Sequence, residues 1–140
     1  TGFYNRKYIP RIGDSNIGDQ NLTNPNNYRA IRYADVLLLA AEAHNRGTGP
    51  DATALNYLNQ VRQRAGLDPE SSTGATLTAA IYNERRLELV GEGHQFFDLV
   101  RTQRAAQEIN GFTAGKNEVC TIQAIEIALA GNRWAQNNGY

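Results

Sequence analysis

The sequence of 140 residues lacks several features by which whole classes of protein are recognised. Its only cysteine, Cys120, excludes an internal disulfide, and no Cys and His residues recur at the spacing of a zinc site. No apolar run reaches the roughly 18 residues that a membrane-spanning helix needs. The charges of the 14 basic and 14 acidic residues cancel, and no basic stripe points to nucleic acid. We therefore expect neither a metal nor a cofactor, and no nucleic-acid partner.

Methionine is also absent, and no charged and then apolar leader follows Thr1. We expect the chain to be either a mature product or a piece of a longer protein. Its length suffices for one domain with a true core, because a chain of this size buries roughly 68% of its unfolded surface on folding.

The pattern that recurs along the chain is helical. Apolar residues follow one another at intervals of three and four over residues 28–46 and again over 51–66. The first helix is apolar on too many sides for a surface helix, so we expect it to be buried. Two more helices are predicted, from 76 or 77 to 90 and from 94 to 108, with a glycine turn between them.

This order predicts a mainly α fold of tetratricopeptide-like antiparallel helix pairs, stacked as in an α-solenoid. The expected organisation is a single domain, residues 1–140. It comprises an irregular lead-in (1–27), a first helix pair (28–66), a loop (67–75), a second helix pair (76–110) and a tail (111–140). In the tail, "NEVCTI" predicts a short extended segment and "QAIEIALAG" a short helix.

The stretch "ERRLELVGEGHQFFDLVR", residues 84–101, concentrates acids, arginines and a histidine. Glu84 falls in an apolar stripe with Ala80 and Leu87, so its carboxylate needs a cation or donors once buried. One interpretation is acid–base catalysis by Glu84, Glu88, Glu92 or Asp98 together with His94. The other is an arginine–carboxylate network that fixes how the third and fourth helices cross.

The abundance of arginine favours the structural interpretation. A nearby guanidinium lowers the pKa of a carboxyl group, whereas a general acid needs that pKa raised. We therefore predict no catalytic residue and no enzyme. Candidate ligand-binding residues are aromatic instead, because exposed rings stack on sugars. These candidates are Tyr4, Tyr8 and Trp134.

Four segments together resemble the C-terminal part of the SusD/RagB family: "IRYADVLLLAAEAHNRG", "ALNYLNQVRQRAGL", "ERRLELVGEGHQFFDLVRT" and the closing "QNNGY". The opening "TGFYNRKY" is similar to the family's lead-in, and the resemblance covers nearly the whole chain. Two departures lie in the tail. Thr121, Ile122 and Gln123 stand where the family often has Pro-Ile-Pro, and Asn138 replaces the proline of the terminal motif.

The resemblance implies a helical, non-catalytic nutrient-binding lipoprotein of polysaccharide utilisation at the surface of the bacterial outer membrane. Such proteins capture glycans or other nutrients and work with a SusC-like TonB-dependent transporter. This chain would be the C-terminal fragment of one, without the signal peptide and without the lipid anchor, which Cys120 does not match. The family's sugar-stacking aromatics lie largely upstream of the quoted motifs, so the resemblance assigns no ligand residue.

Two alternatives remain open from the residues alone. The helix pairs also suit a helical-repeat scaffold that binds a protein or peptide in its concave groove. The clustered carboxylates leave room for a glycosidase, whose two acids stand roughly 5–10 Å apart. We also expect an isolated fragment to expose a stacking face, and so to melt lower than the whole protein or to associate.

Overall fold

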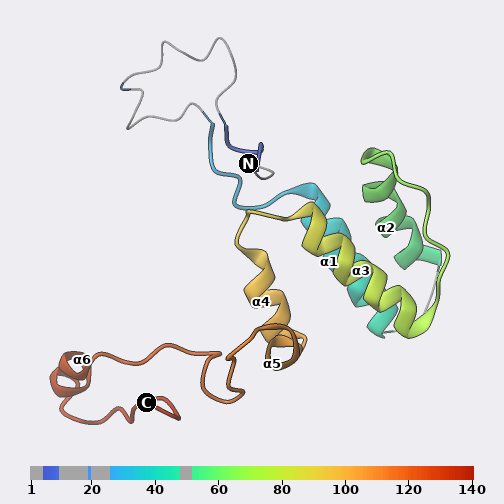
Figure 1. Cartoon of the computed structure of the whole chain (residues 1–140). Coiled ribbons are helices and arrows are strands. Elements are labelled where there is room, and N and C mark those ends of the chain that lie inside the picture. Colours follow the sequence, from blue (N-terminus) through green and yellow to red (C-terminus); the bar gives the residue numbers. More distant parts are fainter. Residues whose placement is uncertain (1–4, 10–18, 20–25, 48–51) are drawn as a thin grey trace. The chain divides into compact units, whose positions relative to one another are not determined.

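The computed structural model describes residues 5–9, 19, 26–47 and 52–140 (Figure 1). The chain divides into two compact units, Thr1–His94 and Gln95–Tyr140, which are described separately. The prediction of a mainly α chain is confirmed, since every regular element of the described residues is a helix.

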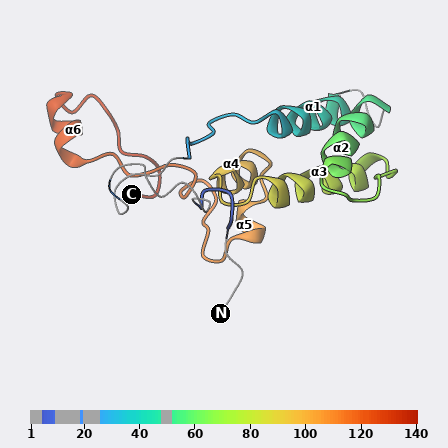
Figure 2. The ribbon, with the colours of Figure 1, turned by 90° about the horizontal axis from the view of Figure 1, so that it is seen from above.

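Three helices form the first unit: α1 (Tyr33–Gly47), α2 (Ala52–Arg64) and α3 (Gly74–Glu88). α1 packs against both of the others, and α3 lies beside it in both views (Figures 1 and 2). The helices meet through one apolar core in which Leu38, Leu58, Leu77 and Ile81 are completely buried. Each burial of this size contributes about 1.5–3 kcal/mol. The arrangement of α1 and α2 as a packed pair agrees with the sequence pattern.

The prediction that the first helix is buried holds for only one side of it. Leu37, Leu38 and Ala41 are buried, as their spacing indicated. Tyr33, Val36 and Leu39, however, are 73%, 48% and 42% exposed. α2 and α3 cover one side of α1, and nothing in the described part of the chain covers the side that carries these three residues.

The helix ends follow local chemistry. α2 ends where predicted, because Gly66 adopts a φ of +74°, and the amide of Leu67 then donates to the carbonyl of Arg62 at 2.9 Å. α1 begins at Tyr33, five residues later than predicted, since residues 28–32 are not helical. The first turn of α1 is stabilised by the carbonyl of Arg32, which accepts hydrogen bonds from the amides of Asp35 and Val36.

The second unit contains α4 (His94–Arg101), α5 (Ala105–Glu108) and α6 (Ala124–Leu129). The predicted single helix over 94–108 is therefore wrong: it is two helices with a break between them. Gln103 has a φ of +60°, and the amide of Arg104 bonds to the carbonyl of Leu99 at 2.8 Å, which closes α4. Residues other than glycine seldom adopt this conformation, so the sequence carries no signal for it.

The tail forms the predicted short helix, α6, but the segment "NEVCTI" forms no strand. Side chains of the closing "QNNGY" hold the tail together. The Gln136 amide group both donates to and accepts from the backbone of Ile122, each bond 2.8 Å long. Asn137 donates to the carbonyl of Cys120, and the Tyr140 hydroxyl donates to the carbonyl of Val119. The motif thus closes a loop around α6.

Candidate functional site

The charged groups of the first unit converge at the end of α3. Arg32, which precedes α1, donates from Nε to Glu92 Oε2 at 2.7 Å and from Nη1 to Glu88 Oε1 at 2.8 Å. Its Nη2 also donates to the backbone carbonyl of Glu88 at 2.9 Å. One guanidinium therefore binds two carboxylates and a helix-end carbonyl, which fixes its plane.

Lys7 joins the same group of charges from the lead-in. Its ammonium donates to the carbonyls of Glu88, at 2.6 Å, and Val90, at 3.1 Å, and it forms an ion pair with Glu92. A cation is favourable here, because the last carbonyls of a helix lack intrahelical partners and carry partial negative charge.

Arg64, the last residue of α2, completes the group. Its Nη2 lies 2.6 Å from Glu88 Oε2, so the two oxygens of Glu88 are shared between arginines from two different segments. We call this group, made of Lys7, Arg32, Arg64, Glu88 and Glu92, the ion-pair cluster. It ties the lead-in, the start of α1 and the end of α2 to the end of α3.

The electrostatics of the ion-pair cluster favour the ionised carboxylate. Glu92 is only 5% exposed, and this burial alone would raise the pKa of its carboxyl group. Hydrogen bonds and charge from Arg32 and Lys7 outweigh the burial, so the pKa of Glu92 is lowered. The pKa of Arg32 is raised, chiefly by its hydrogen bond to Glu92. A carboxyl group in this state is a poor general acid.

Glu84 and Arg85 have partners on other helices of the same unit. Glu84 is 3% exposed, as predicted, and its Oε2 lies 3.0 Å from Nη1 of Arg62 on α2. Arg85 is equally buried and pairs with Asp35 on α1 at 2.8 Å. The predicted network exists, but its ion pairs join α3 to α1, to α2 and to the segments that precede α1, so it fixes the crossing of α3 with α1 and α2.

One detail of the predicted stripe is wrong. Leu87 is 58% exposed, and the buried face of α3 is formed by Leu77, Ile81 and Glu84. In the second unit, Asp98 and Arg101 pair at 2.7 Å, as their i, i+3 spacing indicated.

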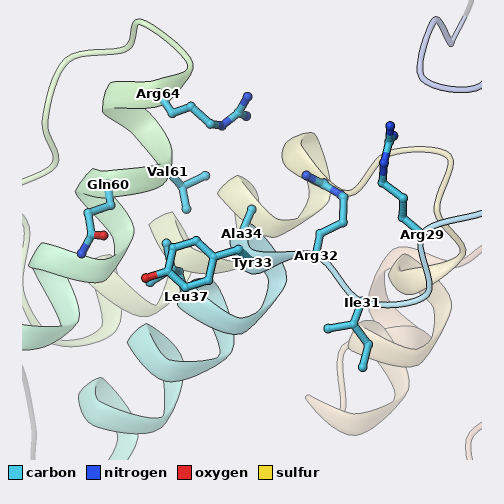
Figure 3. A pocket seen from close by; sticks show the side chains of 9 residues that line it. All are labelled: Arg29, Ile31, Arg32, Tyr33, Ala34, Leu37, Gln60, Val61 and Arg64. Atoms are coloured by element: carbon cyan, nitrogen blue, oxygen red, sulfur yellow. The ribbon is translucent and has the colours of Figure 1, made fainter.

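A pocket of about 500 Å³ opens between the start of α1 and α2. Tyr33, Leu37 and Val61 form its apolar part, and Figure 3 shows the side chains of Arg29, Arg32 and Arg64 rising on one side of it. A smaller pocket of about 300 Å³ adjoins the ion-pair cluster and is lined by Tyr8 and Leu87 as well as by charged groups.

The three aromatic ligand candidates belong to different parts of the chain. Tyr4 lies outside the described residues. Tyr8 stacks on Tyr28, with ring centres 6.2 Å apart and planes inclined by 22°, and the ring of Tyr28 is largely exposed. Trp134 belongs to the second unit and is 56% exposed. All three stay predictions.

Sequence reasoning did not single out Lys7, Arg32, Arg62 or Arg64. These residues lie 20 or more positions from the acids that they bind, and no local spacing marks a pairing of that kind. A signal was present in the acids themselves: Glu84, Glu88 and Glu92 recur every four residues, which places them along one side of a helix.

Over residues 5–9, 19, 26–47 and 52–140, no three His, Cys, Asp or Glu side chains are grouped so that they could hold a metal ion. Within the same residues, no helix has the length and apolar character needed to cross a bilayer.

Comparison with known proteins gives consistent results. The family model described as "SusD family" matches residues 1–123. "SusD-like protein P25" of Formosa agariphila is 37% identical over 108 residues, which are 69% of this chain. Two solved structures are also similar. A "laminarin binding SusD-like protein" is 46% identical over 79% of the chain with a TM-score of 0.66. "Surface glycan-binding protein A" from Bacteroides uniformis is 35% identical over 84%, also with a TM-score of 0.66.

The chain spans only a fraction of these relatives. The matched part is 19% of the Formosa protein, 22% of the laminarin-binding protein and 29% of the Bacteroides protein. The predicted fold class, mainly α with tetratricopeptide-like helix pairs, is that of these relatives and is confirmed. With a family match over most of its residues and the same helical fold, the chain belongs to the SusD family.

Proposed function

We propose that this chain is the C-terminal part of a longer protein that captures a nutrient glycan, without catalysis, at the surface of the bacterial outer membrane. In this proposal the longer protein is a lipoprotein that passes its ligand to a SusC-like TonB-dependent transporter. The observation that carries the proposal is the 46% identity to a laminarin-binding SusD-like protein of known structure.

The state of the carboxylates supports binding without catalysis. Glu84, Glu88 and Glu92 each form an ion pair with an arginine, and the pKa of Glu92 is lowered. A glycosidase needs one carboxylic acid that keeps its proton near neutral pH. The lowered pKa of Glu92 is the opposite of what a general acid needs, and in this proposal the three ion-paired carboxylates hold helices together.

Two exposed aromatic positions suit contact with a sugar. The stacked rings of Tyr8 and Tyr28 present an aromatic surface beside the ion-pair cluster, and Trp134 presents an indole in the second unit. Sugar rings stack on such faces while their hydroxyl groups bond to neighbouring polar groups. Tyr28 is therefore added to the candidates Tyr4, Tyr8 and Trp134.

The direct test is calorimetric titration of the full-length protein with laminarin and with a panel of unrelated glycans. We expect saturable binding of at least one glycan and no release of shorter sugars. Tyr28→Ala and Trp134→Ala each test one aromatic position, with Tyr82→Ala on α3 as the control for the loss of a tyrosine. Binding of no glycan in the panel, or release of product, would contradict the proposal.

The carboxylates supply a second test. We expect the affinity for the glycan to survive Glu84→Gln and Asp98→Asn in variants that still fold. A folded and equally stable variant that loses binding would assign a ligand role to that carboxylate. Co-purification of the full-length protein with a SusC-like outer-membrane transporter from the same organism tests the partner, and recovery of the protein alone from mild detergent would argue against it.

A further inference from the structure

One side of α1 is apolar and is left uncovered by the residues that the structure describes. It carries Tyr33, Val36 and Leu39 at successive intervals of three, and Ile31, just before the helix, is 75% exposed. Residues that recur every three or four positions lie on one side of a helix, so these side chains form one surface. An apolar surface of this kind normally contacts protein.

The same surface continues into the pocket of about 500 Å³ between α1 and α2, where Leu37 and Val61 add to the apolar lining (Figure 3). Tyr33 belongs to both the exposed surface and the pocket, so the two are continuous. We call the combination of Ile31, Tyr33, Val36, Leu39 and this pocket the α1 surface.

The charge beside the α1 surface is positive. Four cations, Lys7, Arg29, Arg32 and Arg64, line the two adjoining pockets, against the two carboxylates of Glu88 and Glu92. Arg29 forms no ion pair with any residue that the structure describes, and the side chain of Arg64 is 63% exposed. Arg64 already pairs with Glu88, so the excess is a net one: among the described groups that line the two pockets, cations outnumber carboxylates by two. This excess suits an occupant that carries carboxylates next to apolar side chains.

The relatives are several times longer than this chain, which indicates a source for such an occupant. The chain accounts for 19–28% of the curated relatives and 22–30% of the solved ones, so most of a SusD-type polypeptide lies outside it. A helix of a longer helical domain buries its second side on neighbouring helices of the same chain.

We infer that the α1 surface is an internal docking surface, covered in the full-length protein by an amphipathic acidic segment from the remainder of the same polypeptide. The apolar side chains of that segment contact Tyr33, Val36 and Leu39, and its carboxylate meets Arg29 and Arg64. This inference rests on the proposal that the chain is part of a longer SusD-type protein, and it does not depend on which glycan is bound.

The test measures how fast a thiol on the α1 surface reacts in the full-length protein. Val36→Cys is compared with Gln63→Cys, whose position on α2 is exposed and polar, in a background with every other cysteine, including Cys120, replaced by serine. We expect N-ethylmaleimide to label the Val36→Cys thiol roughly tenfold or more slowly, because labelling then needs local opening. Leu39→Cys replaces the Val36 variant if that one does not fold.

Two outcomes overturn the inference. Equal labelling rates at the two positions mean that the α1 surface is open to solvent and to soluble ligands. Protection that disappears on dilution means that a second copy, and not the same polypeptide, covers the surface.

The charge part is tested separately by Arg29→Glu, with Arg133→Glu in the second unit as the matched control. We expect Arg29→Glu to speed labelling of the Val36→Cys thiol by several-fold while the control leaves it unchanged. No change in either variant overturns the assignment of a carboxylate to the occupant. Glycan binding is read in a different assay, so failure of the proposed function would leave these labelling rates as they are.

Discussion

The two compact units of the chain are stabilised in different ways. The first unit buries a continuous apolar core contributed by three helices, and an ion-pair cluster closes one end of it. The second unit buries only two apolar residues, Leu99 and Ala105, and α6 buries none. The second unit is held instead by hydrogen bonds between side chains of its last residues and the backbone of residues 119–122.

This difference sets the expected order of opening. A buried leucine contributes about 1.5–3 kcal/mol, whereas a hydrogen bond that replaces one to water contributes about 1 kcal/mol net. Segments with few buried apolar contacts open locally at lower free energy than the core does. We therefore expect the second unit to open before the first, and the predictions below test this order.

The largest effect is expected in the core of the first unit. Leu58→Ala removes a completely buried side chain and should lower the free energy of unfolding by about 2–5 kcal/mol. Leu129→Ala, at a residue that is 75% exposed on α6, should change it by less than about 0.5 kcal/mol. Urea denaturation of both variants measures the two changes in the free energy of unfolding. Equal losses would contradict the proposed difference in stabilisation between the two units.

The ion-pair cluster should come next. Glu92→Gln keeps the shape of a buried side chain but leaves Arg32 and Lys7 without one carboxylate, so we expect a loss of about 3 kcal/mol. Glu126→Gln on the exposed face of α6 serves as the control and should be close to neutral. A Glu92 variant as stable as the wild type in urea would show that the cluster adds nothing to the core.

A smaller and local effect is expected in the second unit. Gln136→Ala removes two bonds to the backbone of Ile122 and should cost about 1–2 kcal/mol. Amide hydrogen exchange should become faster over residues 119–140 and stay unchanged in α1, α2 and α3. Faster exchange in the first unit would mean that the two units open together.

The last prediction is a dependence of stability on pH in the first unit, carried by one carboxyl group. The pKa of Glu92 lies below its ordinary value of 4.5 in the folded chain, so the unfolded chain binds the proton more readily. The stability from this group is fully present above that ordinary value and is lost as the pH falls through the lowered pKa. Unfolding free energies of wild type and Glu92→Gln should therefore differ by a constant amount above pH 4.5 and converge as the pH falls below it. Parallel curves would contradict this.

Most of the first unit was predictable from sequence because its signals are local. The spacing of Leu37, Leu38 and Ala41 marked the core side of α1, and Gly66 marked the end of α2. The second unit was harder for a physical reason. Its helix break depends on Gln103, a residue that gives no conformational signal, and its tail depends on bonds between residues that are 14–21 positions apart.

The candidate site also has features that were predictable from sequence and features that were not. Burial of Glu84 followed from its place between apolar neighbours, so the need for a cation was predictable. The identity of that cation was not, since Arg62 lies 22 positions away on another helix. The exposed side of α1 was also mispredicted. An apolar pattern predicts that a side of a helix is buried, but it does not identify the segment that covers that side.

The contact between Lys7 and Glu92 joins residues 85 positions apart. Closing a loop of that length costs only about 0.6 kcal/mol more than closing one half as long, but it makes the contact non-local, and non-local contacts slow folding. On the ribosome, Lys7 and Arg32 are exposed to solvent before residues 88 and 92 have been synthesised. We therefore expect the ion-pair cluster to form late, after α1 and α2 can already pair.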